Sequence, residues 1–193
     1  MTTGPATATV EGMHLDYAAL EAGLDHVRNA PADQGTLELI VRRPAEGERE
    51  VLAEAKIDTD AGLVGDGWLN RSGDPACQIT VMNARAAALV ARTRDRWPLA
   101  GDQLYVDFDI SGENLPPGTR LAVGSAVIEV SHLPHRGCKK FMARFGLEAL
   151  RFVNSEQGYA LNLRGINTTV VQAGVVRTGD PVTKLPAGHP AAA

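Results

Sequence analysis

Apolar residues recur at every second position in the first strand-like segments of the chain. Leu37, Leu39 and Val41 form one such run, and residues 51–57 repeat the pattern after a turn at Glu46-Gly47. Side chains two residues apart lie on the same face of a strand, so this period predicts half-buried β-strands.

Short strands at close spacing dominate the rest of the chain. The predicted strands, with Gly and Pro turns between most of them, cover residues 77–82, 103–110, 120–123, 126–131 and 167–172. Regular short strands of this kind are typical of a closed or folded-over antiparallel barrel. The predicted fold class is therefore mainly β with short helices, an α+β chain built on a β-barrel.

Two segments before the middle of the chain have helical spacing. Residues 17–28 place Leu20, Leu24 and Val27 on one face. Residues 83–97 are rich in Ala, begin at Asn83, whose side chain can cap a helix, and precede a proline. Both segments are predicted to be helices.

A third helical segment interrupts the late strands. Phe141, Phe145, Ala149 and Phe152 fall roughly on one helical face within residues 138–154, and Gly146 breaks the segment. The pattern predicts one or two short helices that lie against the barrel.

Length and composition indicate one domain with an aliphatic core. The chain has 193 residues, 5% aromatics and a formal charge of −4. Residues 11–185 are predicted to form the domain, and residues 1–10 and 186–193, which are rich in Ala, Thr, Gly and Pro, are predicted to be disordered. The acidic balance argues against nucleic-acid and anionic-membrane partners. With no recognisable signal peptide and no apolar run of about 20 residues, the expected location is the cytoplasm.

The two cysteines have different surroundings. Cys77 begins an apolar run with Ile79 and Val81 and is predicted to lie in the core. Cys138 follows a Pro and Gly loop and precedes a helix, with Arg136, Lys139 and Lys140 beside it. Neighbouring positive charge favours the thiolate, which attacks electrophiles, carries sulfur or binds a soft metal. A buried structural cysteine is the alternative.

Positive charge is concentrated around Cys138. Residues 136–151 carry five basic residues against one acidic residue, in a chain that is acidic as a whole. A local cluster of this size suits a small anion better than a long polyanion. His135 can tune Cys138 or can be a solvated loop histidine. No histidine pair has zinc-site spacing, and no Walker or dinucleotide-binding loop is present.

Seven segments in order give the chain a resemblance to the MOSC domain, named for the C-terminal part of molybdenum cofactor sulfurases. The segments are residues 61–66, 78–82, 111–115 (Ser-Gly-Glu-Asn-Leu), 121–124, 126–130, 138–146 (Cys-Lys-Lys-Phe to Arg-Phe-Gly) and 174–182. The resemblance spans residues 58–182. The chain departs from the family pattern at Gly137, where the family has proline, at residues 67–69 and at residues 163–166.

The resemblance implies a β-barrel that holds the pterin form of molybdenum cofactor, with Cys138 as the metal ligand. In reductase members of the family, the metal removes oxygen from N-hydroxylated small molecules. The candidates for binding the pterin phosphate are Arg136, Lys139, Lys140, Arg144 and Arg164. Glu113 and Asn114 would line the pocket, although Asn114 can equally stabilise a turn.

Three functions remain open at this point. The first is a molybdenum-dependent oxidoreductase supplied by a separate electron-donor protein. The second is a module in which Cys138 carries sulfur or holds the cofactor for another protein. The third is a barrel without a cofactor, because fold alone does not determine function.

Overall fold

The computed structural model describes residues 14–186, and its centre is a closed β-barrel. The barrel strands, in the order in which they pair, are β1 (Gln34–Arg42), β11 (Pro181–Lys184), β7 (Arg120–Val123), β8 (Ala126–Val130), β9 (Ile166–Gln172), β5 (Ile79–Asn83) and β6 (Leu104–Asp107). Pairing between β11 and β1 closes the ring. This confirms the predicted fold class, mainly β with short helices. All these pairs are antiparallel except β5 with β6.

Two smaller pieces of sheet extend the barrel. The strand β2 (Glu50–Leu52) pairs with the end of β1. A separate sheet has the order β10 (Gly174–Arg177), β3 (Glu54–Asp58) and β4 (Gly62–Leu63). Ala55, Ile57 and Val176 from this sheet join the same apolar cluster as the barrel strands, so the small sheet packs on the barrel.

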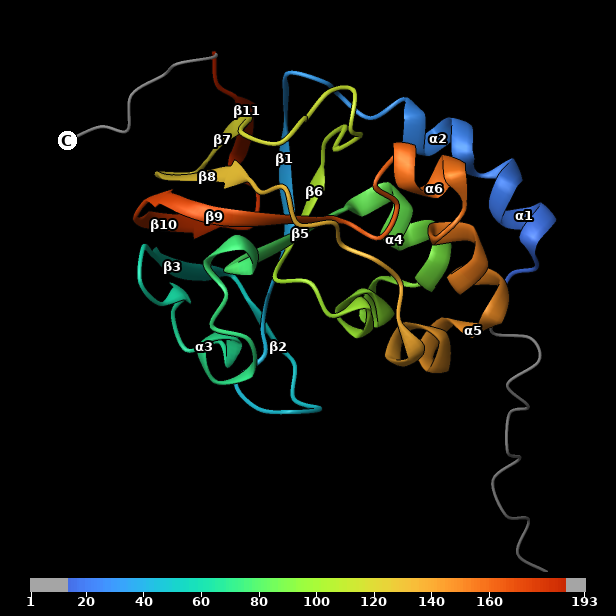
Figure 1. Ribbon diagram of the computed structural model, residues 1–193, viewed down its shortest axis with the longest axis horizontal. Coiled ribbons are helices and arrows are strands. Elements are labelled where there is room, and N and C mark those ends of the chain that lie inside the picture. The colour runs from blue at the N-terminus through green and yellow to red at the C-terminus, as the bar shows by residue number, and fades with distance from the viewer. Residues whose placement is uncertain (1–13, 187–193) are drawn as a thin grey trace, which may run out of the picture.

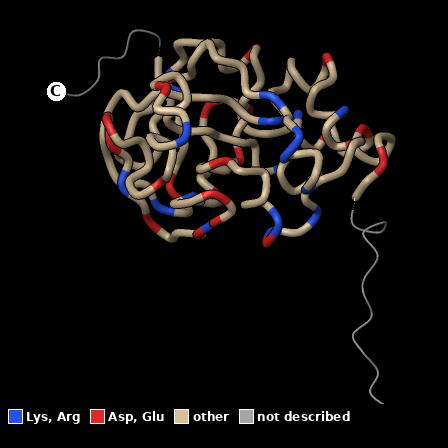
Figure 2. The backbone as a smooth tube through the Cα atoms, turned by 60° about the horizontal axis from the view of Figure 1, so that its bottom comes forward, with Lys and Arg blue, Asp and Glu red and all other residues tan. Residues whose placement is uncertain are grey.

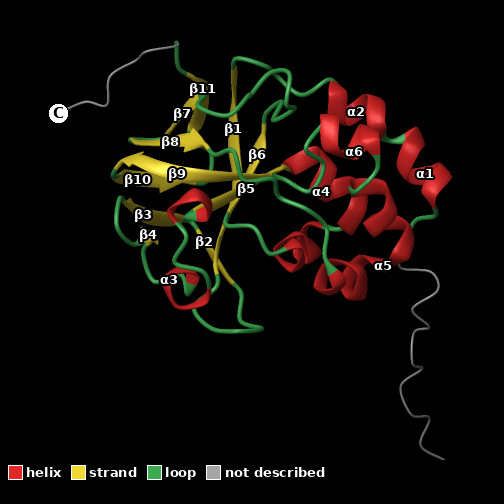
Figure 3. Ribbon diagram, in the orientation of Figure 1, coloured by secondary structure: helices red, strands yellow, loops and turns green. Residues whose placement is uncertain are grey.

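Most of the helices gather on one side of the barrel (Figures 1 and 3). The α-helices are α1 (Tyr17–Ala22), α2 (Leu24–Arg28), α3 (Trp68–Arg71), α4 (Ala84–Ala91), α5 (Lys139–Val153) and α6 (Glu156–Ala160), and the 3-10 helices are η2 (Pro75–Cys77) and η3 (Arg94–Ala100). Among the α-helices of the described residues, α3 alone lies away from the others, beside the small sheet. No helix within residues 14–186 is long and apolar enough to cross a membrane.

The strand β1 is buried on both faces, unlike the half-buried strand that its sequence predicts. A register irregularity between Leu37 and Leu39 lies in its pairing with β6. Leu37 and Ile40 therefore pack in the barrel cluster, whereas Leu39 and Val41 pack with the helices. One added residue in a strand moves the following side chains to the opposite face.

The helix predicted over residues 83–97 forms only in part. The Asn83 side chain accepts hydrogen bonds from the backbone N–H groups of Arg85 and Ala86, which confirms it as the cap of α4. Arg92 then adopts a φ of 67°, which ends α4, and the chain continues as η3 with Pro98 inside it.

The prediction that Cys77 lies in the strand core is wrong. Asp74 accepts a hydrogen bond from the Ala76 N–H and Pro75 follows it, so the chain forms the turn η2 before the strand begins at Ile79. The Cys77 thiol is only partly buried and lies 3.3 Å from the Ser72 hydroxyl oxygen. The predicted disordered ends lie outside the described residues, apart from Pro186.

Gly146 divides α5 into two parts, as its sequence predicts. Its φ of 89° and ψ of 168° are open to glycine and strained for other residues. A Cβ at this position would also lie 2.9 Å from the His14 ring, which packs here and donates from Nε2 to the Arg144 carbonyl oxygen.

We expect Gly146→Ala to lower the free energy of unfolding by about 3 kcal/mol, because backbone strain and overlap with His14 add together. Gly118→Ala is the control, since Gly118 has a φ of 88° but no atom within 4 Å of the place that an added methyl group would take. That change should cost about 1 kcal/mol from strain alone. Urea unfolding measures both, and equal losses would contradict the packing contribution.

Candidate functional site

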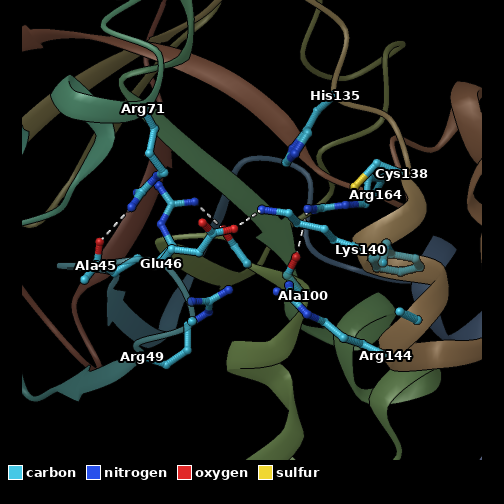
Figure 4. Close-up of a pocket in the computed structure, with 15 residues that line it drawn as sticks. Ala45, Glu46, Arg49, Arg71, Ala100, His135, Cys138, Lys140, Arg144 and Arg164 are labelled. Atoms are coloured by element: carbon cyan, nitrogen blue, oxygen red, sulfur yellow. Dashed lines mark hydrogen bonds and ion pairs between the residues drawn. The ribbon is translucent and has the colours of Figure 1, made fainter.

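A pocket of about 740 Å³ opens between the barrel and the helices (Figure 4). Five parts of the chain reach it: the β1–β2 loop, α3, the end of η3, the first half of α5 with the loop that enters it, and the segment before β9. Its charged lining is mostly basic, in a chain whose acidic and basic residues are otherwise interspersed along the backbone (Figure 2). The basic residues that line it are Arg43, Arg49, Arg71, Lys140, Arg144 and Arg164.

Four consecutive carbonyl groups at the end of η3 hold four of these arginines. The Pro98 carbonyl oxygen accepts from Arg49 Nε at 3.1 Å, and the Leu99 oxygen accepts from Arg144 Nη1 at 2.8 Å. The next two accept from other arginines: Ala100 from Arg164 Nη2 at 2.9 Å, and Gly101 from Arg43 Nη1. The last carbonyls of a helix lack partners within the helix, so they are available to side-chain donors.

Two buried carboxylates neutralise three of the arginines. Asp66 accepts from Arg43 Nε at 3.0 Å and from Arg71 Nη2 at 2.7 Å, and its side chain is fully buried. Asp102, also fully buried, accepts from Arg164 Nη1 at 2.6 Å. The two carboxylates therefore compensate the positive charge of the arginines that donate to them.

Arg49 and Arg144 have no carboxylate partner among residues 14–186. Both guanidinium groups donate their hydrogen bonds to backbone carbonyl oxygens, which carry no full negative charge. Burial, and then the neighbouring charges of Arg144 and Arg43, lower the pKa of Arg49. An arginine keeps its proton at neutral pH even so. The pair is therefore an uncompensated double positive charge that a small anion would stabilise.

Lys140 lies at the exposed rim of the pocket. Its ammonium group donates to Glu46 Oε1 at 2.6 Å, and this bond lowers the pKa of the Glu46 carboxyl group. Both side chains are mostly in solvent, so the pair contributes little to stability. A ligand that displaces Glu46 would gain access to the Lys140 charge.

His135 and Asp102 meet beside Arg164 at the inner wall of the pocket. His135 Nδ1 lies 3.4 Å from Asp102 Oδ1, and both atoms are buried without a hydrogen bond, as is Arg164 Nε. Burial first, and then the Arg164 charge, lower the pKa of His135 to about 3 against the opposing effect of Asp102. The ring is therefore neutral at pH 7. A neutral ring that directs Nδ1–H toward Asp102 leaves Nε2 as a hydrogen-bond acceptor.

Glycine is required where the chain passes this cluster. Gly165 has a φ of 111°, and a Cβ there would lie 2.6 Å from the Val81 carbonyl oxygen and 3.3 Å from both His135 Nδ1 and Asp102 Oδ1. This close approach allows the neighbouring Arg164 to reach Asp102 from the segment before β9.

Cys138 supplies the thiol of the pocket. It is exposed and takes the N-cap position of α5 in extended backbone conformation, and it makes no side-chain capping bond. Figure 4 shows the sulfur on the same side of the pocket as His135 and Arg164. A soft donor therefore lies next to a set of positive groups.

The structure brings four of the predicted site residues to one pocket: Cys138, Lys140, Arg144 and Arg164. Lys140 and Arg144 are four residues apart in α5, so they lie on the same helical face. Lys139 is exposed in the first turn of the helix and does not line the pocket.

Three other predicted residues also lie outside this pocket lining. The Arg136 guanidinium is stacked 4.1 Å above the Tyr159 ring. Glu113 is exposed. The Asn114 amide donates to the carbonyl oxygen of Asp109 and to that of Ala32, which is distant in sequence, so it holds two segments of backbone together.

Sequence reasoning missed the residues that reach the pocket from the first half of the chain. Arg43, Arg49 and Arg71 belong to no motif, and their common feature, bonding to η3 carbonyls or Asp66, exists only after folding. The one available signal is Asp66 itself, which closes the early glycine-aspartate segment and is held in a buried position.

Comparison with known proteins identifies related folds. A family model described as the MOSC domain matches residues 69–183, more than half of the chain. The structure is similar to the YUAD protein from Bacillus subtilis, with a TM-score of 0.57, 16% identity, and coverage of 77% of this chain and 94% of that one. It is also similar to YiiM from Escherichia coli, with a TM-score of 0.54, 19% identity, and coverage of 81% and 72%.

YiiM from Geobacillus stearothermophilus is similar as well, with a TM-score of 0.51, 15% identity, and coverage of 81% of this chain and 75% of that one. At such identities the likeness concerns the fold. The comparison with curated proteins finds no match.

The lowered pKa of His135 predicts an acid-sensitive fold. Between about pH 6.5 and the folded pKa, the unfolded chain binds a proton at this residue and the folded chain does not, so stability falls as the pH falls. From pH 7 to pH 5 this contribution amounts to about 2 kcal/mol. His135→Gln should lose that part of the pH dependence in urea unfolding. Parallel stability curves for the two proteins would contradict the assignment.

Proposed function

Because the chain belongs to the MOSC domain family, we propose that its pocket binds molybdenum cofactor and that the Cys138 thiolate is the protein ligand of the metal. The proposed reaction is reduction of N-hydroxylated small molecules, in which two electrons and two protons convert an N–OH group to N–H and water. A separate electron-donor protein supplies the electrons. The observation that carries the proposal is an exposed thiol in the same pocket as two guanidinium groups that have no carboxylate partner within residues 14–186.

The residues of the pocket fit the chemical groups of the cofactor. Its phosphate is a small anion, and Arg49 and Arg144 provide a double positive charge with free donor capacity. Its metal accepts soft ligands, and thiolate is the soft donor that the pocket offers at Cys138. A volume of about 740 Å³ lies within the usual range of roughly 300–1,000 Å³ for a small-molecule site.

Other polar groups of the pocket suit a planar heterocycle. His135 Nε2 can accept a hydrogen bond from a ring N–H group, and Arg164 Nε is a buried donor without a partner in the described part of the chain. The Arg164 guanidinium is itself held against Asp102 and 5.2 Å from the Phe141 ring centroid, so it needs little reorganisation on binding. Preorganised groups lower the entropic cost of binding a ligand.

The chain and the cofactor would divide the chemistry between them. When bound, the molybdenum centre supplies the two-electron oxygen-transfer chemistry. Cys138 keeps one ligand position fixed on the protein, while the arginines stabilise the negative charge of the ligand. His135, neutral at pH 7, accepts a hydrogen bond rather than adding another charge.

A sulfur-carrier function is the second candidate, because the Cys138 thiol is exposed and could hold a persulfide. Analysis of protein produced in a molybdenum-replete host separates the two. Stoichiometric molybdenum supports the oxidoreductase proposal. A labile additional sulfur on Cys138 without molybdenum supports the carrier.

We expect Cys138→Ser to lose bound molybdenum without loss of thermal stability. The hydroxyl is nearly isosteric with the thiol at this exposed position, but it is a harder donor that stays protonated at neutral pH. Cys77→Ser is the matched control, and it should melt close to the wild type and keep the metal, because its partly buried site already offers polar neighbours. Full metal content and reductase activity in Cys138→Ser would exclude Cys138 as the ligand.

Arg49→Gln combined with Arg144→Gln should weaken binding of a pterin phosphate by at least about a hundredfold. Each charge-assisted bond contributes roughly 1.5–3 kcal/mol, and the substitution removes both of these cations from the pocket. Arg136→Gln, which changes a basic residue outside the pocket, should leave the affinity unaltered. Calorimetric titration of cofactor-free protein compares the wild type, the double variant and Arg136→Gln. A similar loss of affinity in the double variant and in Arg136→Gln would place the anion site elsewhere.

A further inference from the structure

The backbone just before Cys138 is held by a side chain from the far end of α5. Asn154 Oδ1 accepts a hydrogen bond from the Gly137 N–H at 2.9 Å, and Asn154 Nδ2 donates to the Gly137 carbonyl oxygen at 3.0 Å. One amide side chain therefore satisfies both backbone groups of a single residue. Such a two-point contact fixes the orientation of the peptide as well as its distance.

The kink at Gly146 makes this contact possible. A straight helix over the 15 residues of α5 would be about 22 Å long and would place Asn154 far from Gly137. The non-helical backbone at Gly146 instead returns the chain, so that residues 17 apart in sequence are hydrogen-bonded. The break therefore brings the two ends of α5 together beside the pocket.

Gly137 packs closely against the second half of α5, where a side chain would displace its neighbours. A Cβ at this position would lie 2.8 Å from Val153 Cγ2 and 2.9 Å from Leu150 Cδ1. The residue must also keep its N–H, because that group donates to Asn154. Proline at this position would remove the donor.

Cys138 is thus restrained on both sides. The residue before it is bound to Asn154, and its own carbonyl oxygen accepts from the Met142 N–H at 3.0 Å as α5 begins. With the backbone held, the position of the sulfur depends mainly on rotation about the Cα–Cβ bond. Few conformations are then lost when the thiolate engages a ligand.

We propose that Asn154 is a positioning residue that holds Cys138 where its thiolate can bind the ligand in the pocket. In this chain the hydrogen-bonded pair of Asn154 and Gly137 provides the rigidity before the cysteine. The role toward a metal rests on the proposed function. The restraint on Cys138 does not, and it is measured separately.

The test compares Asn154→Leu with Asn114→Leu. Each change removes an asparagine amide that donates to backbone carbonyl groups, and Asn114 lies outside the pocket lining. Both variants are expected to melt a few degrees below the wild type. Molybdenum retained per chain should fall about tenfold in Asn154→Leu and stay unchanged in Asn114→Leu.

A nitroxide label on Cys138, in a Cys77→Ser background, reports the restraint without any cofactor. Its rotational motion should be several-fold faster in Asn154→Leu than in the parent protein, and unchanged in Asn114→Leu. Asn154→Asp is the second variant if Asn154→Leu does not fold. Its carboxylate keeps the acceptor for Gly137 N–H but opposes the Gly137 carbonyl oxygen, so its label motion should be intermediate.

The outcomes separate the two proposals. Unchanged label motion in both Asn154 variants would overturn the inference, as would faster motion with full molybdenum retention. Faster motion with loss of metal supports it. If the wild type itself binds no molybdenum while the label moves faster in Asn154→Leu, the proposed function fails and the restraint of Cys138 by Asn154 stands.

Discussion

The bonds between four arginines and the last carbonyl groups of η3 determine the shape and the charge of the pocket. Carbonyls at the end of a helix need donors, and burying them without donors costs free energy. Here the donors come from the β1–β2 region, α5 and the segment before β9. The same contacts therefore join the barrel to the helices and collect positive charge at one place. A chain with an overall charge of −4 thereby forms a pocket whose charged lining is mostly basic.

The buried carboxylates divide the five arginines that line the pocket into two groups. Asp66 and Asp102 compensate Arg43, Arg71 and Arg164, which are then structural parts of the wall. Arg49 and Arg144 keep an excess charge directed at whatever occupies the pocket. His135 adds a neutral polar group to this basic wall, because burial and Arg164 disfavour its protonation more than Asp102 favours it. The pocket thus combines attraction for an anion with a neutral acceptor and a thiol.

Local pattern predicted the parts of the structure that depend on local forces. The Asn83 cap and the Gly146 break are confirmed, and the barrel class followed from the spacing of short strands. The period-two pattern located the strand β1 but not its burial on both faces, which depends on the helices packed against it. Cys77 was misplaced because the Asp74-Pro75 turn outweighed the apolar run behind it. The basic residues around Cys138 were treated as one cluster, but helical geometry separates Lys139 from Lys140. Arg49 could not be predicted, since its partner, the Pro98 carbonyl, is defined only by tertiary structure.

Closure of the barrel also affects how folded molecules of this protein can associate with one another. Unpaired strand edges are templates on which sheets of different molecules can join, and a ring of strands has none. In the described part of the chain, the strands left at a sheet edge are β2, with three residues, β4, with two, and β10, with four. Edges this short offer few hydrogen bonds to a second molecule. The fold is therefore protected against edge-to-edge aggregation by its topology, independently of whether its pocket is filled.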